Sequence, residues 1–175
     1  MIMSELVPVL SEESIAGLVT EMAEKLSKDY RGMDLIMIGV LKGGIHFLSD
    51  LVRKMSIPVK LDFLQAASYG SGTCSSGSIR LQKDIDIGIK DSHVLVVEDI
   101  VDTGRTLTCL IDHLKSFQPA SVKICALIDK TERREVSLPV DYACHAVDHG
   151  FLVGYGMDFD EKYRHLPALY HMIKE

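Results

Sequence analysis

Two almost wholly apolar runs of strand length, joined by one amphipathic helix, most constrain how this chain can fold. The runs are HVLVV at 93–97 and VKICALI at 122–128. Between them, the segment that begins at Arg105 places these apolar side chains on one helical face: Leu107, Leu110, Ile111, Leu114 and Phe117. A strand, a helix and a strand within about 35 residues form a right-handed crossover unit, which requires a parallel sheet covered on both faces. The sequence therefore predicts an α/β fold.

The N-terminal third repeats this pattern. Ser11 is positioned to cap a helix whose apolar positions recur at three- and four-residue intervals: Ile15, Leu18, Val19, Met22 and Leu26. An apolar run of strand length, DLIMIGV, follows at 34–40. After LKGG (41–44) comes a second helical stripe: Phe47, Leu48, Leu51, Val52 and Met55. We therefore expect a further strand with helices on both sides of it in the sequence.

The segment 59–66 alternates in the way that is typical of a half-buried strand. Its apolar residues Val59, Leu61 and Phe63 should share one face, opposite Lys60 and Asp62. The stretch 68–78 holds mostly Ser and Gly, cannot bury a face and is expected to be a mobile loop. Alternation at Ile85, Ile87 and Ile89 then predicts an antiparallel return strand.

Length and charge restrict the classes of function. A chain of 175 residues with 47% hydrophobic residues fits one globular domain. The formal net charge of -6 disfavours a non-specific grip on nucleic acid or anionic lipid, because Lys and Arg drive that binding. The sequence has no apolar run of the ~18 residues that a membrane span needs, and its N-terminus lacks a signal pattern. We expect a cytoplasmic protein with no nucleic-acid or membrane partner.

The cysteines and histidines do not indicate a metal site built by the protein alone. The four cysteines include no C-x-x-C pair, and the seven histidines include no H-E-x-x-H motif.

Polar or glycine-rich segments follow three of the expected strands. They are LKGG (41–44), EDIVDTG (98–104) and Asp129-Lys130. In open α/β sheets, ligands bind beyond the carboxyl ends of the strands. These three segments should therefore meet at one ligand site.

The longest of the three, with the start of the next helix, carries the chemistry of a phosphate and sugar site. Residues 103–106 (Thr-Gly-Arg-Thr) surround a helix start with N–H groups, hydroxyls and a guanidinium, which suits a phosphomonoester. Glu98 and Asp99 suit a vicinal diol or, through water, a divalent cation. The plainer alternative is that Asp102 or Thr103 only caps the helix, but a cap needs one acceptor and this loop carries three carboxylates. The segment matches neither the P-loop nor the dinucleotide fingerprint.

The segment VLVVEDIVDTGRTL (94–107) resembles the phosphoribosyl pyrophosphate signature of type I phosphoribosyltransferases. LKGG (41–44) resembles their pyrophosphate loop, and SYGS (68–71) the start of their flexible catalytic loop. LIDK (127–130) and FLVGYGMDFDEKYRHLP (151–167) resemble the purine pocket of the hypoxanthine-guanine branch. The resemblance runs from about residue 9 to the end. It implies a single domain (1–175) with a central parallel sheet flanked by helices, a flexible loop and a small hood from about 1–12 and 140–175.

By resemblance, one set of residues holds the phosphoribosyl pyrophosphate. Glu98 and Asp99 engage the ribose hydroxyls and Mg²⁺, and Asp158 helps to place a second Mg²⁺. The 5′-phosphate is bound by Thr103, Gly104, Arg105 and Thr106. The pyrophosphate is bound by Arg164 and by the backbone of Lys42 and Gly43. An unusual peptide geometry is expected at Lys42 and Gly43. Arg105 is a departure, because Lys is frequent there in the family, and phosphate geometry is in doubt at that position.

A second set handles the purine and the chemistry. The resemblance implies that Asp102 is the general base near purine N7, and that Ser68 and Tyr69 close over the reaction centre. It implies purine contacts from Lys130 to the 6-oxo group, from Phe151 and Ile100 to the two ring faces, and from the main chain of Leu152. Taken singly, Phe151 could be a core aromatic, Lys130 a solvated charge and 68–78 a surface linker.

The expected reaction requires these residue types together. Displacing pyrophosphate from C1 of ribose develops positive charge on the sugar and negative charge on the leaving group, which Mg²⁺ and the LKGG amides would stabilise. A carboxylate near N7 would take the purine proton, and a closing loop would exclude water.

We therefore expect an enzyme of purine salvage, a hypoxanthine phosphoribosyltransferase that also takes guanine. The resemblance also implies a homodimer or homotetramer. Two alternatives stay open: a regulator of this fold that binds RNA, and a transferase with another specificity, such as xanthine. The acidic balance and the set Asp102, Lys130, Phe151 and Asp158 argue against the regulator.

Overall fold

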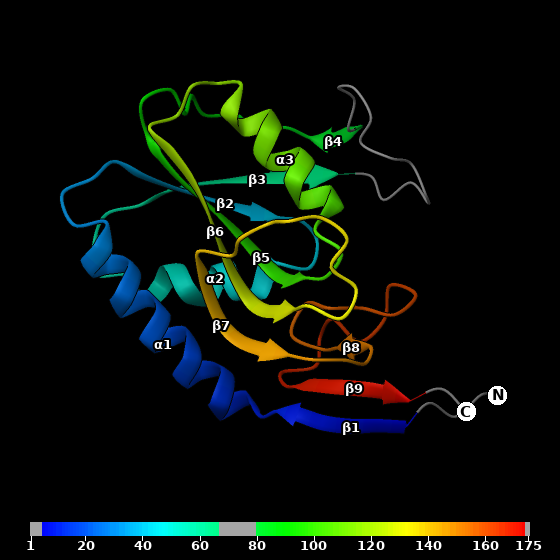
Figure 1. The fold of residues 1–175 in the computed structure, drawn as a ribbon. Helices are drawn as coiled ribbons and strands as arrows, with labels where there is room; N and C mark the ends of the chain where they lie inside the picture. The colour runs from blue at the N-terminus through cyan, green and yellow to red at the C-terminus, as the bar shows by residue number, and fades with distance from the viewer. Residues whose placement is uncertain (1–4, 67–79, 174–175) are drawn as a thin grey trace.

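The computed structural model describes residues 5–66 and 80–173, and within these ranges the chain forms two sheets and three helices (Figure 1). The larger sheet has six strands in the order β4-β3-β2-β5-β6-β7. The strands are β2 Leu35–Val40, β3 Lys60–Ala66, β4 Leu81–Lys83, β5 His93–Val101, β6 Ser121–Lys130 and β7 Tyr142–Val147. The helices are α1 Glu12–Asp29, α2 Ile45–Lys54 and α3 Arg105–Lys115. The α/β class is confirmed.

The central crossover is confirmed, but its strands are longer than the sequence indicated. β5, α3 and β6 follow one another, and β5 pairs in parallel with β6 from His93↔Ser121 to Val101↔Asp129. β5 therefore does not end at residue 97, and the strand ladder carries Glu98 and Asp99. The ladder with β2 ends at Gly39↔Val97, so pairing with β6 holds the backbone from which these two carboxylates project.

Helices cover both faces of this sheet because the strand side chains alternate. Leu35 and Met37 belong to the core beneath α1 and α2, whereas Ile36 and Ile38 belong to the core beneath α3. All four are at most 1% exposed. Burying one such side chain contributes about 1.5–3 kcal/mol.

The helix boundaries follow local chemistry. Ser11 caps α1 as expected, because its backbone is extended and its Oγ accepts the Ser14 N–H at 3.1 Å. α3 ends at Lys115, so Phe117 does not extend its apolar face and is 39% exposed. None of the helices in the described ranges is both long and apolar enough to cross a membrane.

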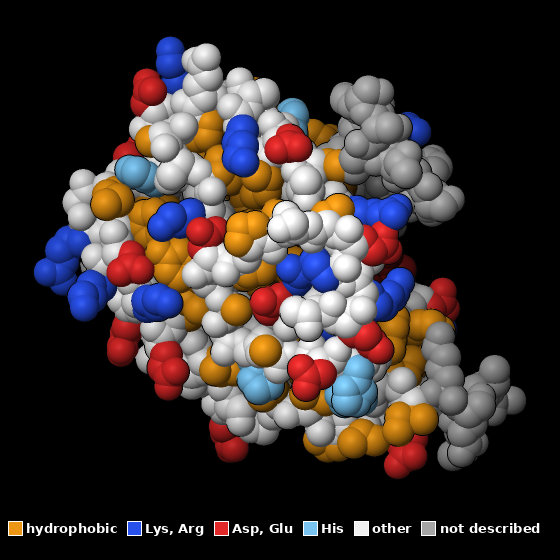
Figure 2. Space-filling model, viewed as in Figure 1, with side chains coloured by type: hydrophobic (Ala, Val, Ile, Leu, Met, Phe, Trp, Pro, Cys, Tyr) orange, Lys and Arg blue, Asp and Glu red, His pale blue; other side chains and the backbone are white. Residues whose placement is uncertain are grey.

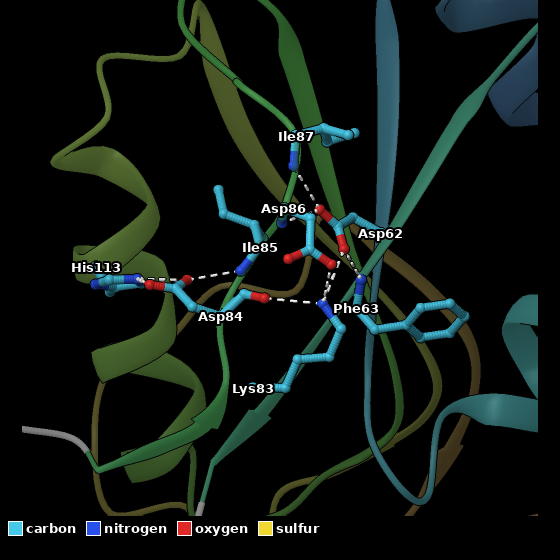
Figure 3. A network of polar contacts seen from close by, with 8 residues as sticks. All are labelled: Asp62, Phe63, Lys83, Asp84, Ile85, Asp86, Ile87 and His113. Atoms are coloured by element: carbon cyan, nitrogen blue, oxygen red, sulfur yellow. Dashed lines mark hydrogen bonds and ion pairs between the residues drawn. The ribbon is translucent and has the colours of Figure 1, made fainter.

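The side-chain burial expected for β3 is wrong at two positions. Asp62 is 5% exposed, whereas Leu61 is 42% exposed. The Asp62 carboxylate accepts the N–H groups of Phe63 (2.7 Å), Asp86 (2.7 Å) and Ile87 (3.0 Å), and Lys83 Nζ lies 3.3 Å away (Figure 3). A buried carboxylate is tolerated when its acceptor sites are satisfied in this way.

The return strand also differs from the expectation. It is the short β4, which pairs antiparallel with β3, and not the Ile85, Ile87 and Ile89 segment. Residues 84–92 form no strand, because Asp62 accepts the N–H groups of Asp86 and Ile87. Ile89 is nevertheless buried in the core beneath α3. The loop expected at 68–78 lies outside the described residues.

The smaller sheet joins segments from the two ends of the chain. Its order is β1-β9-β8, with β1 Glu5–Leu10, β8 Leu152–Val153 and β9 Leu169–Ile173. β7 belongs to the main sheet. We call the small sheet, with the segment 154–168 that joins β8 to β9, the hood. Tyr155 Oη donates to Asp50 Oδ2 of α2 at 2.6 Å and ties the hood to the main body.

Candidate active site

The three strand exits meet at one end of the main sheet, beside the hood, on the right in Figure 1. In Figure 2, acidic and basic side chains lie next to one another along this edge. Two adjoining cavities open here, of about 180 Å³ and about 160 Å³, and Ile100 and Asp102 line both. A larger hollow of about 470 Å³ lies elsewhere, between α1, α2 and the hood, and contains none of the predicted site residues.

We call the 180 Å³ cavity the base cavity. Its lining includes seven of the predicted site residues, together with Gly150 and Met157: Asp99, Ile100, Asp102, Lys130, Phe151, Leu152 and Asp158. Asp102 Oδ1 is buried and has no hydrogen-bond partner in the described part of the chain. Lys130 Nζ lies 3.9 Å from that oxygen and 3.5 Å from Glu132 Oε2. The acceptor Asp102 Oδ1 and the donor Lys130 Nζ thus lie side by side. They can bind a ligand that carries a hydrogen-bond donor next to an acceptor.

Two of the plainer alternatives fail in the base cavity. Lys130 is 4% exposed, so it is not a solvated charge. Phe151 is 43% exposed, so it is not a core aromatic, and its ring meets Phe159 edge-on with 5.8 Å between centroids. A flat, partly exposed ring beside a polar pair can stack on a heterocycle.

The second cavity, of about 160 Å³, lies at the start of α3 and is lined by Glu98, Ile100, Val101, Asp102, Thr103, Gly104, Thr106 and Leu107. Gly104 is the N-cap of α3, so neither Asp102 nor Thr103 merely caps the helix. Its φ is +80°, and a Cβ there would meet Val136 Cγ2 at 2.9 Å. Arg105 pairs with Glu135. The helix N-terminus, with threonine hydroxyls, is suited to a phosphate.

Glu98 and Asp99 form a carboxylate pair at the end of β5. Burial raises the pKa of Glu98 well above its ordinary value, and the neighbouring Asp99 charge raises it further. Burial likewise raises the pKa of Asp99, which is 7% exposed. A divalent cation would relieve this repulsion, so the donor set fits Mg²⁺. Within 5–66 and 80–173, no three His, Cys, Asp or Glu side chains converge, so water and substrate oxygens would complete its shell.

LKGG packs directly against this carboxylate pair. A Cβ on Gly43 would lie 2.0 Å from Asp99 Oδ2, so no larger residue fits. The peptide between Leu41 and Lys42 is cis, one bond before the expected Lys42-Gly43 position. Gly44 N–H bonds Val40 C=O at 3.1 Å, whereas the N–H groups of Lys42 and Gly43 have no partner among residues 5–66 and 80–173. These two amides are donors that an anion can use.

Two predicted hood residues contact each other. Arg164 Nη2 lies 2.8 Å from Asp158 Oδ1, and Nη1 donates to Gly156 C=O at 2.8 Å. Lys42 Nζ forms an ion pair with Glu161 Oε2 at 3.0 Å, and Arg164 Nη2 lies 3.3 Å from the same oxygen. A Cβ on Gly156 would lie 2.1 Å from the Gly43 carbonyl oxygen, so Arg164 belongs to the part of the hood that faces LKGG, where it can meet a pyrophosphate. Ser68 and Tyr69 lie outside the described residues.

Sequence reasoning missed Arg134. Its guanidinium donates to the main-chain carbonyls of Val101, Asp102 and Lys130 and to the Asp129 carboxylate. The only available signal was the arginine pair that closely follows Asp129-Lys130 in the sequence. Such a pair is usually a solvated surface feature.

Comparison with known proteins agrees with this geometry. The phosphoribosyl transferase domain family matches residues 9–160. A hypoxanthine-guanine phosphoribosyltransferase of Streptococcus thermophilus is 43% identical over 159 residues, covering 91% of this chain and 88% of that protein. The crystal structure of a hypoxanthine-guanine phosphoribosyltransferase from Bacillus anthracis superposes with a TM-score of 0.90 at 39% identity, covering 98% and 99% of the two chains. A hypoxanthine phosphoribosyltransferase from Staphylococcus aureus does so with a TM-score of 0.90 at 36% identity, covering 95% and 90%.

Proposed function

This chain belongs to the phosphoribosyltransferase family, and from that premise we propose that it transfers 5-phosphoribose from phosphoribosyl pyrophosphate to hypoxanthine and guanine. The products are the purine nucleotide and pyrophosphate, a purine salvage reaction. The observation that carries the proposal is the pair Asp102 and Lys130 in the base cavity, 3.9 Å apart, with an unsatisfied oxygen on Asp102. A 6-oxopurine presents a ring N7–H and a 6-oxo acceptor side by side and so complements this pair.

The chain's own residues account for each part of the reaction. Thr103 to Thr106 hold the 5′-phosphate at the start of α3, and the LKGG amides with Arg164 hold the pyrophosphate as negative charge develops on it. Asp102 accepts the N7 proton of the purine, while Phe151 and Ile100 keep the ring in place. Leu152 adds main-chain contacts. Ser68 and Tyr69 are proposed to close over the reaction centre and exclude water.

Mg²⁺ is part of the proposal. Glu98 and Asp99 would hold it together with the ribose hydroxyls, and Asp158 would help to place a second ion. The bound cation supplies charge stabilisation for the leaving pyrophosphate.

A panel of purines tests the proposal. Lys130 carries only donors, so it satisfies the 6-oxo group of hypoxanthine or guanine but opposes the 6-amino group of adenine. The measurement is kcat/KM for hypoxanthine, guanine, xanthine and adenine with saturating Mg²⁺ and phosphoribosyl pyrophosphate. We expect discrimination against adenine of ~10⁴–10⁵. Equal use of adenine and hypoxanthine would overturn the proposal, and a preference for xanthine would change its substrate.

Variants of Lys130 and Phe151 separate the selectivity between purines from the affinity for any purine ring. Lys130→Ala should narrow the hypoxanthine-to-adenine ratio, mainly through loss of hypoxanthine activity. Phe151→Ala should weaken both bases with little change in the ratio, because stacking treats all purines alike. An unchanged ratio in Lys130→Ala would contradict the role of Lys130.

The proposal extends to a cytoplasmic location and to a homodimer or homotetramer. Light scattering on the purified protein tests the oligomeric state. A solved Trypanosoma cruzi relative, at 36% identity and a TM-score of 0.88, was studied for the role of its C-terminal region in oligomeric state. The RNA-binding alternative is tested by retention on RNA at physiological salt, measured beside nucleotide formation from hypoxanthine.

A further inference from the structure

We propose that Arg134 is a positioning residue that sets the spacing between Asp102 and Lys130; this inference rests on the proposed function. The Arg134 side chain is 17% exposed and lines neither the base cavity nor the cavity at the start of α3. It therefore acts on the purine only through the two residues that would contact it.

The contacts of Arg134 join the ends of two neighbouring strands. On the β5 side, Nη2 donates to Val101 C=O at 3.0 Å, and Nε donates to Asp102 C=O at 2.9 Å. On the β6 side, Nη2 also reaches Lys130 C=O at 3.2 Å and Asp129 Oδ1 at 2.5 Å. Nη1 donates to Leu138 C=O at 3.0 Å, which ties in the chain after the strand.

These contacts begin where the strand ladder stops. The last paired residues of β5 and β6 are Val101 and Asp129. Asp102 and Lys130, one residue further along, have no ladder between them to hold them apart. The planar guanidinium takes over this role, because its donors point in fixed directions.

Lysine cannot replace this arrangement. An ammonium group is a single point on a flexible chain, so it can keep the ion pair with Asp129 but not the simultaneous contacts with both strand ends. Arg134→Lys therefore preserves charge and removes the bridge. Asp129→Asn does the reverse, because it keeps the carbonyl contacts and weakens only the ion pair.

The test is steady-state kinetics with hypoxanthine and phosphoribosyl pyrophosphate varied separately. KM does not depend on the fraction of active enzyme, so a residue that only supports folding changes kcat and leaves both KM values unchanged. For Arg134→Lys we expect KM for hypoxanthine to rise roughly tenfold, the effect of losing one well-placed hydrogen bond. KM for phosphoribosyl pyrophosphate should change less than KM for hypoxanthine. Asp129→Asn should show a smaller shift in the same direction.

The matched control is Arg53→Lys, an exposed arginine on α2 whose one ion pair within the described ranges is with Asp50. It should leave both KM values unchanged. A wild-type KM for hypoxanthine in both Arg134→Lys and Asp129→Asn would overturn the role of Arg134 while the proposed function stands. An unmodified protein that forms no nucleotide from hypoxanthine would instead overturn the proposed function, and this inference with it.

Discussion

Asp102 places one carboxylate oxygen in a buried position where, within residues 5–66 and 80–173, nothing donates to it. Asp102→Asn keeps the shape of the side chain but removes proton acceptance. We expect kcat to fall ~10²–10⁴-fold, the usual contribution of a general base. Affinity for phosphoribosyl pyrophosphate should change little, because Thr103 to Thr106 hold the phosphate.

Single-turnover kinetics measure this effect directly. The control is Asp112→Asn, an exposed carboxylate on α3, which should behave as wild type. A near-wild-type rate in Asp102→Asn would contradict the assignment of the base.

The charged carboxylate of Glu98 is suited to bind a cation, but its burial lowers the stability of the folded protein. Burial and the Asp99 charge raise its pKa, so the protonated form is favoured in the folded state. The protonated carboxyl group therefore stabilises the folded state at low pH. This contribution is lost as the pH rises from about 4.5, the ordinary pKa, through the raised pKa of the folded state. At pH 8, Glu98→Gln should therefore raise the free energy of unfolding by about 0.5–2 kcal/mol. Urea titrations at pH 8 and pH 4 check this, and the gain should shrink at pH 4.

The same variant should bind Mg²⁺ and phosphoribosyl pyrophosphate more weakly, because a cation ligand is lost. Calorimetric titration with both added together measures the affinity. A Glu98→Gln protein that is less stable than wild type at pH 8 would show that the pair is not strained.

At the scale of elements, the Asp62 network links β3, β4 and the segment that follows (Figure 3). Burial alone would raise the pKa of Asp62, but the N–H groups of Ile87, Phe63 and Asp86 and the Lys83 ammonium outweigh it, and the pKa is lowered. The carboxylate therefore contributes stability above its ordinary pKa of 3.8, and this is lost as pH falls through the folded pKa.

Asp62→Asn should lower the free energy of unfolding by ~3 kcal/mol at pH 7, since an NH₂ donor replaces one carboxylate oxygen and then faces buried donors. The difference from wild type should narrow towards pH 3 in urea titrations. Asp86→Asn is the matched control, because Asp86 contacts the same Lys83 at 2.9 Å but its side chain is 82% exposed. Its effect should stay below ~1 kcal/mol. Equal losses from both variants would refute a special role for the buried carboxylate.

The start of α3 depends on a glycine that the helix itself does not require. Gly104→Ala places a Cβ at φ +80° and 2.9 Å from Val136 Cγ2. The left-handed backbone alone opposes it by ~1–2 kcal/mol. We expect lower thermal stability and a raised KM for phosphoribosyl pyrophosphate.

Gly17→Ala, inside α1, is the matched control, since nothing lies within 4 Å of its Cβ position. It should stabilise the protein by roughly 0.5–1 kcal/mol, because Ala favours a helix interior over Gly. The measurements are the thermal unfolding temperature and KM for phosphoribosyl pyrophosphate of both variants. A tolerated Gly104→Ala would mean that the phosphate loop is not held in this conformation.

At the scale of the whole molecule, the hood stays on the main body partly through Tyr155. Its hydroxyl donates to Asp50 at 2.6 Å, and burial, together with this bond, raises its pKa. Tyr155→Phe should lower the free energy of unfolding by about 1.5–3 kcal/mol, as for a hydrogen bond to a charged group. Urea unfolding measures it, and purine selectivity should stay unchanged.

Tyr170→Phe serves as the control, because the Tyr170 hydroxyl makes no hydrogen bond within the described ranges. An equal loss in both variants would show that the Tyr155 bond does not secure the hood.

The sequence by itself determined the parts that depend on near neighbours in the chain. Apolar runs and helical spacing predicted β5, α3 and β6, and Ser11 predicted the start of α1. The meeting of LKGG, EDIVDTG and Asp129-Lys130 also followed, because parallel strands bring their carboxyl ends to one edge of the sheet.

The tertiary structure alone decided which charged groups are buried. Asp62 is inside only because the N–H groups of Asp86 and Ile87, 24 and 25 residues away, satisfy it. Arg134 is partly buried only because the Asp102 carbonyl, 32 residues away, and the other strand ends accept its donors. Periodicity reports the polarity of a side chain but not the partners that distant segments bring to it, and those partners set the free energy of burying a charge.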